Sequence, residues 1–332
     1  MPRTRRRNSG GLRDVRIGHA VAPDGTTGVS VVLFGRAAPT IVDVRGGASG
    51  TYDTASLSLD ATFGRRWGIF FAGGSVFGLD AGGGLRDAVL ADGGGHAVFS
   101  NPNRVAPVSG AVLYDLPRGV RRPVDYRELG RDAAVAARPV RPFAGRTGAG
   151  AGARIGKYLG RGHSQPGALA IEIGRERGLG TVAALAVLNS VGAVRDPATG
   201  RWIAGARDRR GRLVPPDSGI RSAPAGTTLV AVVTDVPVGR PVLQRVGTFV
   251  HAGLARAVVP AHTATDGDAV FVSTVAPTES ARSGASYAPE LADRIGLLAE
   301  RVTVQAIVRA ARAANRATSG LAAGAGSPEG PG

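Results

Sequence analysis

The chain has 332 residues, of which 43% are hydrophobic, enough to bury a large core and to exclude a globally disordered protein. It contains no cysteine, which excludes disulfides, thiolate catalysis and cysteine-ligated metals. The formal net charge of +16 comes from 40 arginines and one lysine, Lys157. The arginines are scattered and aromatic residues make up only 5%, so we interpret the charge as a general surface property and expect no nucleic-acid partner.

Both ends of the chain have compositions typical of unstructured segments. Residues 1–9 form a basic arm with no apolar segment after it, so we expect disorder there and no secretory signal. Residues 318–332 are rich in glycine, serine and proline and are expected to form a disordered tail. No window is long and apolar enough to span a membrane, and we expect a cytoplasmic protein.

Residues 10–317 are expected to fold as one domain in which strands and helices alternate. Apolar runs at residues 28–35 and 39–47 are bounded by glycine and proline, which predicts a pair of strands. Residues 67–92 predict a strand, a glycine turn and a helix. Further strands are expected at residues 110–116, 167–174, 181–194, 227–234 and 268–275, and helices at residues 239–258 and 286–314.

These elements do not follow a strict βαβ repeat. The order favours helices on both sides of stacked sheets, an α+β class, over a doubly wound parallel sheet. Residues 195–225 are polar and rich in turn formers, and a loop of that length inside a domain is usually functional or disordered. This segment ends at Gly226 and Thr227, where the next predicted strand begins.

Lys157 lies in the stretch "GAGARIGKYLG", which has some likeness to a phosphate-binding loop. That pattern requires glycine at position 151 and serine or threonine at position 158, and the chain has Ala151 and Tyr158 instead. Lys157 is therefore either a surface lysine or a buried amine with a lowered pKa, a role that arginine cannot fill.

Three polar side chains, His262, Asp266 and Asp268, lie just before a predicted strand in "HTATDGDAVF". They could bind a metal, orient a catalytic group, or simply form a tight Asp-Gly turn. Asn189, at the end of an apolar run, could bond a turn or stabilise an oxyanion. Tyr114 has the context of a tyrosine that packs at a half-buried position of a β-sheet with its hydroxyl hydrogen-bonded.

Nine stretches of the chain together resemble one family, the L-aminopeptidase/D-esterase or DmpA-like self-processing hydrolases. The resemblance covers roughly residues 10–315 and is closest to the nylon-oligomer (6-aminohexanoate-oligomer) hydrolase branch. The stretches, in family order, are "GLRDVRIGHA", "TTGVSVVLFG", "VDVRGGASGTYDT", "FAGGSVFGLDAGGG", "AVLYDL", "GKYLG", "VLNSVGAV", "GTTLVAVVTDVP" and "HTATDGDAVFVST".

The resemblance implies a four-layer αββα sandwich of the Ntn-hydrolase type and a precursor that cuts itself between Gly226 and Thr227. It implies fragments 1–226 and 227–332, with Thr227 as the N-terminal nucleophile. The remaining site residues that it implies are Lys157 beside the nucleophile, Asn189 on the oxyanion side, Tyr114, and the acidic pair Asp266 and Asp268. This chain departs from the nylon-oligomer branch at Gly226, where that branch has asparagine.

The chemistry of an N-terminal threonine fits this role. A hydroxyl needs a base, and the freed α-amine of Thr227 would be one, with an ordinary pKa of about 7.7–8.0 against about 10.4 for lysine. Before cleavage no such amine exists, so the first cut needs Lys157 or an aspartate as base. The resemblance further implies a small peptide or amide substrate, no cofactor or metal, and a homo-oligomer, a tetramer of processed protomers.

Three rival functions remain open on the sequence. One is endo-hydrolysis of 6-aminohexanoate oligomers by the same site. The second is a metal-dependent hydrolase that uses His262, Asp266 and Asp268. The third, from another class, is a non-catalytic basic binding protein on the same fold.

Overall fold

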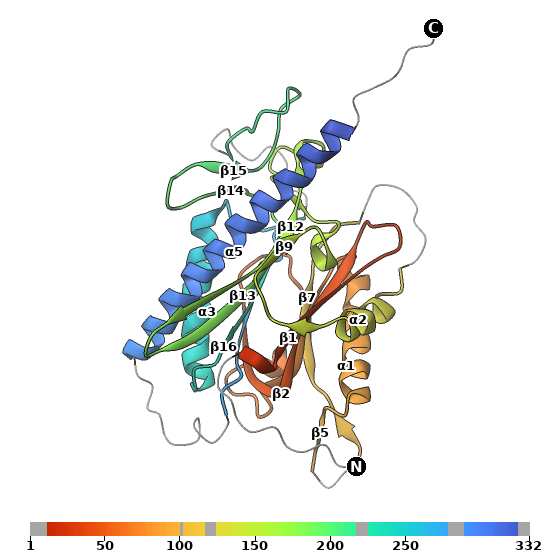
Figure 1. The fold of residues 1–332 in the computed structure, drawn as a ribbon, viewed down its shortest axis with the longest axis vertical. Helices are drawn as coiled ribbons and strands as arrows, with labels where there is room; N and C mark the ends of the chain where they lie inside the picture. The colour runs from red at the N-terminus through yellow and green to blue at the C-terminus, as the bar shows by residue number, and fades with distance from the viewer. Residues whose placement is uncertain (1–11, 100–101, 117–123, 217–224, 278–288, 325–332) are drawn as a thin grey trace.

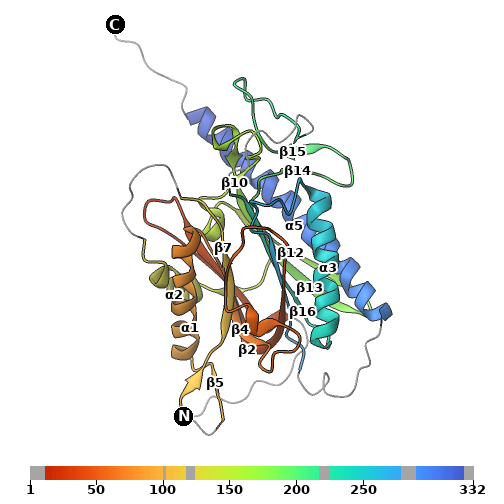
Figure 2. The ribbon, with the colours of Figure 1, turned by 180° about the vertical axis from the view of Figure 1, so that it is seen from behind.

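The structure is a computed structural model that describes residues 12–99, 102–116, 124–216, 225–277 and 289–324. The basic arm expected at residues 1–9 lies outside the described residues. Helices lie on both sides of the molecule, with the strands between them (Figure 1). The reverse view in Figure 2 shows the same order of layers.

Two β-sheets share one long strand, β2 (Gly28–Val44). The first sheet contains, besides β2, the strands β3 (Gly50–Tyr52), β7 (Val108–Val112), β4 (Arg65–Ala72), β1 (Val15–Val21) and β8 (Arg138–Pro139). The second contains β18 (Ala269–Thr274), β16 (Thr227–Thr234), β13 (Gly180–Asn189), β12 (Ala168–Glu176) and β9 (Phe143–Gly145).

The four main helices are α1 (Ala81–Ala91), α2 (Tyr126–Val135), α3 (Arg240–Ala257) and α5 (Pro289–Gly324). Short strand pairs join β5 (His96–Ala97) to β6 (Arg104–Val105), β10 (Arg154–Ile155) to β11 (Gln165–Pro166), and β14 (Ala193–Arg195) to β15 (Trp202–Ala204) and β17 (Val258–Val259). Short 3-10 helices are η1 (Leu12–Asp14), η2 (Ala55–Leu57), η3 (Ser75–Asp80), η4 (Gly148–Gly150) and η5 (Arg161–His163).

The two strands predicted at residues 28–35 and 39–47 are one strand, so that prediction is wrong. Residues 29–33 of β2 pair with β4, and residues 40–44 pair with β18 of the other sheet. The register on β4 shifts between Leu33 and Ala38. Strands that pass from one sheet to another do so through such a bend. Gly35 and Pro39 therefore mark a corner in one strand, whereas they were interpreted as the limits of two.

Side-chain alternation along the strands divides the core into three layers. Val31 packs toward α1 and α2, whereas its neighbour Val32 packs between the sheets. In β16, Leu229 faces the space between the sheets and Val230 faces α3 and α5. Because both faces of each sheet are covered, the strands have nearly continuous apolar sequences. The layer order is helix, sheet, sheet, helix, which confirms the predicted αββα sandwich.

Three predicted boundaries differ from the structure. The strand expected at residues 181–194 ends at Asn189, and β14 starts only at Ala193. The strand expected at residues 110–116 ends at Val112, so Tyr114 follows it. Helix α5 continues to Gly324, so the tail expected from residue 318 starts inside this helix.

Candidate functional site

The candidate site lies at one edge of the second sheet, where three strand ends meet. β16 and β18 are parallel, so they start at the same edge, and Gly226 pairs with Asp266 just before them. β13 runs antiparallel to β16 and therefore ends at that edge, with Asn189 opposite Thr227. This topology brings together residues that are separated by up to about 80 positions in the chain.

Thr227 is the first residue of β16 and its side chain is buried. Its hydroxyl Oγ1 is in short hydrogen-bonding contact with the carbonyl oxygen of Gly226, the residue before it. The backbone N–H of Gly267 donates to the same carbonyl oxygen at 2.9 Å. The carbonyl of the Gly226–Thr227 peptide bond is therefore held from two sides, with the threonine hydroxyl next to it.

Lys157 is buried beside this peptide bond. Its Nζ donates to the backbone carbonyl oxygens of Asn189 at 2.6 Å and of Ala225 at 2.9 Å. Burial lowers the pKa of the Lys157 ammonium from 10.5 to about 7, and the negative charge of Asp266 opposes this shift. Near pH 7 a substantial fraction of Lys157 is thus a neutral amine that can accept a proton.

Asn189 is fully buried and its side-chain amide is held at both ends. Oδ1 accepts a hydrogen bond from the backbone N–H of Arg154 at 3.0 Å, and Nδ2 donates to the carbonyl oxygen of Tyr114 at 3.1 Å. The structure thus joins Tyr114 to the site through its backbone, while the residue is 42% exposed. An amide Nδ2 carries two N–H groups, so one remains for a substrate oxygen.

Asp266 is buried against the Gly226 backbone. Its Oδ1 accepts from the N–H of Val191 at 3.2 Å, and its Oδ2 accepts from the N–H and hydroxyl of Thr263 at 3.2 and 2.8 Å. Burial, together with the charge of Asp268, raises the pKa of the Asp266 carboxyl above its usual value. A Cβ atom at Gly226 would lie 2.4 Å from Asp266 Oδ1, so only glycine fits there in this arrangement.

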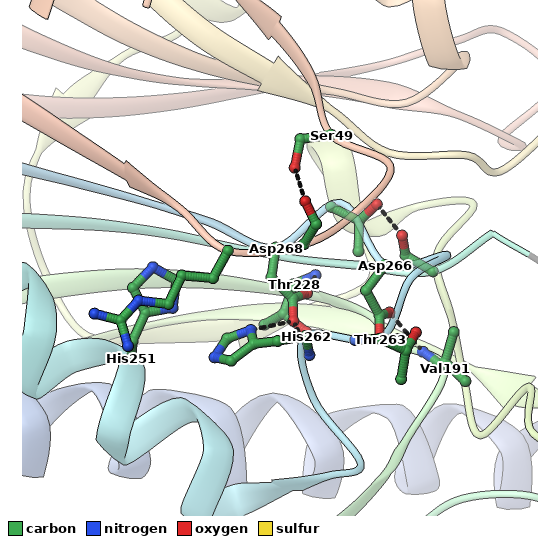
Figure 3. A network of polar contacts seen from close by, with 12 residues as sticks. Ser49, Val191, Thr228, His251, His262, Thr263, Asp266 and Asp268 are labelled. Atoms are coloured by element: carbon green, nitrogen blue, oxygen red, sulfur yellow. Dashed lines mark hydrogen bonds and ion pairs between the residues drawn. The ribbon is translucent and has the colours of Figure 1, made fainter. Parts of the chain in front are cut away.

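Asp268 accepts three N–H groups in a buried setting. Its Oδ1 accepts from the backbone N–H of Thr228 at 2.6 Å. Its Oδ2 accepts from the backbone N–H of His262 at 2.9 Å and from the imidazole Nδ1 of that residue at 2.8 Å. Figure 3 shows His262 between this contact and His251. Asp268 is therefore fixed against the backbone of Thr228, the residue that follows Thr227 in β16.

The arrangement of His262, Asp266 and Asp268 does not favour the metal hypothesis. The two aspartates point to different partners, and His262 is occupied by Asp268. Within the described ranges, no group of three or more His, Cys, Asp or Glu side chains is placed to hold a metal ion.

Our interpretation of the sequence missed one backbone segment of the site. The segment after β2 contacts the aspartates through main-chain atoms, because Gly46 N–H donates to Asp268 O at 3.2 Å and Ala48 N–H donates to Asp266 O at 2.8 Å. A Cβ at Gly46 would lie 2.3 Å from Asp266 O. Close approach of glycine backbone was the available indication, in the "RGG" of that segment.

The glycine turn at residues 73–74 binds a carboxylate through its backbone. Gly74 has a left-handed backbone, with φ of 80°, and its N–H donates to Asp115 Oδ1 at 2.7 Å. The carboxylate bound at this turn is thus that of Asp115 in the same chain.

Among the described helices, none is long and apolar enough to cross a membrane.

Comparison with known proteins agrees with this geometry. The profile described as Peptidase family S58 matches residues 12–322. An uncharacterised aminopeptidase of Mycobacterium tuberculosis is 31% identical over 320 residues, which cover 89% of this chain and 90% of that protein. The 6-aminohexanoate-oligomer endohydrolase of Paenarthrobacter ureafaciens is 30% identical over 328 residues, covering 90% and 84%.

Solved structures share the fold at lower identity. A β-aminopeptidase of Burkholderia sp. superposes with a TM-score of 0.60 at 18% identity, covering 96% of both chains. The L-aminopeptidase D-Ala-esterase/amidase of Ochrobactrum anthropi, described as a variant of the Ntn-hydrolase fold, gives a TM-score of 0.59 at 17% identity and covers 91% of this chain and 86% of that one. Fold, site and sequence match together show that the chain belongs to Peptidase family S58 and is a hydrolase of peptide or other amide bonds.

Proposed function

We propose that the chain is a precursor that cuts its own Gly226–Thr227 bond and then hydrolyses amides with Thr227 as an N-terminal nucleophile. The observation that carries this proposal is the contact of the Thr227 hydroxyl with the Gly226 carbonyl. Three buried ionisable groups lie close to that bond, namely Lys157, Asp266 and Asp268.

The first cut would be an acyl shift from nitrogen to oxygen. Thr227 Oγ1 attacks the Gly226 carbonyl carbon and gives its proton to the neutral amine of Lys157. The Gly267 N–H donates to the carbonyl oxygen as it becomes an oxyanion, which stabilises the tetrahedral intermediate. The C–N bond then breaks, the Thr227 nitrogen takes a proton, and water hydrolyses the resulting ester to a Gly226 carboxyl group.

The mature reaction would use the amine that this cut releases. The Thr227 α-amine accepts the proton of the Thr227 hydroxyl, which attacks the substrate carbonyl and forms an acyl-threonine ester. The leaving amine takes a proton, and water then hydrolyses the ester. In this proposal Asn189 Nδ2 donates its second N–H to the substrate oxyanion, and Asp268 holds the start of β16 through Thr228.

The substrate class that we propose is a peptide or aminoacyl amide, with release of an N-terminal residue. The second candidate is endo-hydrolysis of 6-aminohexanoate oligomers, which the name of the relative from Paenarthrobacter ureafaciens supports. We further propose that processed protomers assemble into a homo-oligomer in the cytoplasm. Light scattering on the purified protein before and after processing tests the assembly.

A hydrolysis panel tests the function. The wild type and Thr227→Ala are incubated with aminoacyl p-nitroanilides, dipeptides and linear 6-aminohexanoate oligomers, and products are separated by mass spectrometry. We expect the wild type to hydrolyse members of the first two groups and Thr227→Ala to hydrolyse none. Turnover of the oligomers alone would support the second candidate. Hydrolysis by Thr227→Ala at the wild-type rate would overturn the proposed nucleophile.

A further inference from the structure

Two histidine rings close the candidate site on the side of Asp268 that faces away from Thr228. His262 precedes β18, and His251 lies in the second half of α3. Their ring centroids are 4.8 Å apart and the rings are inclined by 72°, an edge-to-face contact. Figure 3 shows the order His251, His262, Asp268. His262 is thus the only side chain, among the described residues, that donates to the Asp268 carboxylate.

The partners of the ring nitrogens fix where the protons are. His262 Nδ1 faces a carboxylate oxygen at 2.8 Å and must donate to it. His251 Nε2 faces the backbone carbonyl oxygen of Asp43 at 3.0 Å and must also donate. The opposite nitrogens, His262 Nε2 and His251 Nδ1, are buried and have no hydrogen-bond partner among the described residues. The Nδ1 proton of His262 is thus directed at Asp268, and the Nε2 proton of His251 at the Asp43 carbonyl oxygen.

Burial, more than the charged groups around the pair, keeps His251 neutral near pH 7. Burial lowers the pKa of His251 to about 4, and the positive charge of Arg45 acts in the same direction. Asp43, which lies on β2 with Oδ1 3.9 Å from His251 Nε2, opposes that shift. On the other side, the charged group facing His262 is Asp268 itself. The ring that packs against His262 is therefore a neutral one near pH 7.

The backbone at His262 is also fixed in an uncommon conformation. Its φ is 57°, in the left-handed region, where asparagine and aspartate are tolerated much better than most residues. In this conformation the backbone N–H and the side-chain Nδ1 of His262 both reach the same oxygen, Asp268 Oδ2. One residue therefore provides two of the three N–H groups that hold this carboxylate.

We propose that His262 is a positioning residue for the hydrolase, which holds Asp268 in the orientation that supports the N-terminal end of β16, with His251 packed behind it. This inference rests on the proposed function, because Asp268 matters only if Thr227 is the nucleophile. Among the described residues, no hydrogen bond or ion pair connects His262 to Thr227. Loss of the hydrogen bond from His262 to Asp268 should therefore lower kcat and leave KM nearly unchanged.

Two variants of nearly equal shape test the proposal, namely His262→Asn and His262→Asp. Both side chains tolerate the left-handed backbone. Asparagine Nδ2 can replace imidazole Nδ1 as a donor to Asp268, whereas an aspartate carboxylate offers no donor there. We expect His262→Asn to process itself and to keep kcat within about threefold of the wild type, and His262→Asp to lose about tenfold or more in kcat with KM unchanged.

The readouts are the processed fraction by intact mass, kcat and KM on the best amide of the panel, and the thermal midpoint of each variant. Equal loss of kcat in both variants would overturn the proposal, because it would show that the imidazole ring and not its N–H is required. Wild-type kcat in a folded, processed His262→Asp would overturn it as well. A wild type that neither processes itself nor hydrolyses amides would instead overturn the proposed function, and is recognised before any variant is made.

Discussion

Strand β16 carries buried threonines at both ends, and the two ends differ in what surrounds them. At the far end, Thr234 Oγ1 donates to Thr181 O at 3.0 Å and accepts from Val236 N–H at 3.2 Å. At the near end, the Thr227 hydroxyl contacts the carbonyl of its own preceding peptide bond. Burial is almost the same, with 0% of Thr234 and 3% of Thr227 exposed, so burial does not distinguish them.

The two ends of β16 differ in the ionisable groups that lie near each threonine. Near Thr227 a buried lysine has a lowered pKa and a buried aspartate has a raised one. The hydrogen-bond partners of the Thr234 hydroxyl, among the described residues, are backbone groups. Shifted pKa values in a group of buried residues are typical of a catalytic site, whereas a hydroxyl satisfied by the main chain is typical of a structural role.

The largest expected effect comes from removing each hydroxyl in turn. Thr227→Val should abolish processing and hydrolysis, because valine has the same shape and no nucleophile. Thr234→Val should process like the wild type and lower only the free energy of unfolding, by about 1–3 kcal/mol for the buried polar groups left unpaired. Intact mass and thermal unfolding of both variants check this. Processing by Thr227→Val would contradict our assignment of a catalytic role to Thr227 and a structural role to Thr234.

The second effect concerns the two aspartates. Asp268→Asn should lower kcat by roughly 100-fold, because the amide must turn an N–H toward either Thr228 N–H or the His262 donors. The measurement is kcat on processed enzyme. Asp266→Asn is the matched control, because it changes another buried carboxylate in the same turn. We expect this variant to lower the rate of the first cut more than it lowers kcat. A wild-type kcat in Asp268→Asn would show that this carboxylate has no part in turnover.

The third effect is the pH dependence of processing. If Lys157 is the base for the first cut, only its neutral form acts, and the fraction of that form rises with pH. Its pKa of about 7 means that the rate should fall about tenfold per unit below pH 7 and level off above about pH 8. Freshly refolded precursor, sampled over time from pH 5 to pH 9, gives this profile. The Lys157→Met variant should process slowly at every pH from 5 to 9. A steep dependence of its processing rate on pH would show that another group titrates.

The smallest effect is at Gly226. A methyl group there would meet Asp266 Oδ1 and Val191 N at 2.4 and 2.5 Å. Gly226→Ala should therefore displace Asp266 and slow processing by about fivefold to tenfold, while the mature enzyme, in which residue 226 is a free chain end, turns over normally. Time courses of processing, followed by kcat on the processed fraction, separate the two. A slower mature enzyme would show that Asp266 keeps its displaced position after the cut.

Part of this site could be predicted from the sequence and part could not. The apolar run that starts at Thr227 gave the limits of β16 correctly, and the family resemblance indicated which residues should meet there. Gly35 and Pro39 were wrongly interpreted as strand ends because a bend between sheets uses the same residues as a turn. The environment of His262 depends on His251 and on Asp43, which lies 208 residues from His251, and no local pattern contains such a contact.

Tyr114 shows a different limit of sequence patterns. It was predicted as a site residue, and its contact to Asn189 is made by the backbone carbonyl, while the ring is exposed. A pattern of residue types describes side chains and gives no information on which carbonyl faces a neighbour. The role of the Tyr114 ring toward a substrate stays a prediction.

The most direct test of self-cleavage is the intact mass of the purified wild-type chain after prolonged incubation at pH 8. We expect two species, residues 1–226 and 227–332, whose masses together equal the full chain plus one water, and a new N-terminal sequence that starts at Thr227. A single full-length chain that persists under these conditions, in a folded protein, would contradict the account.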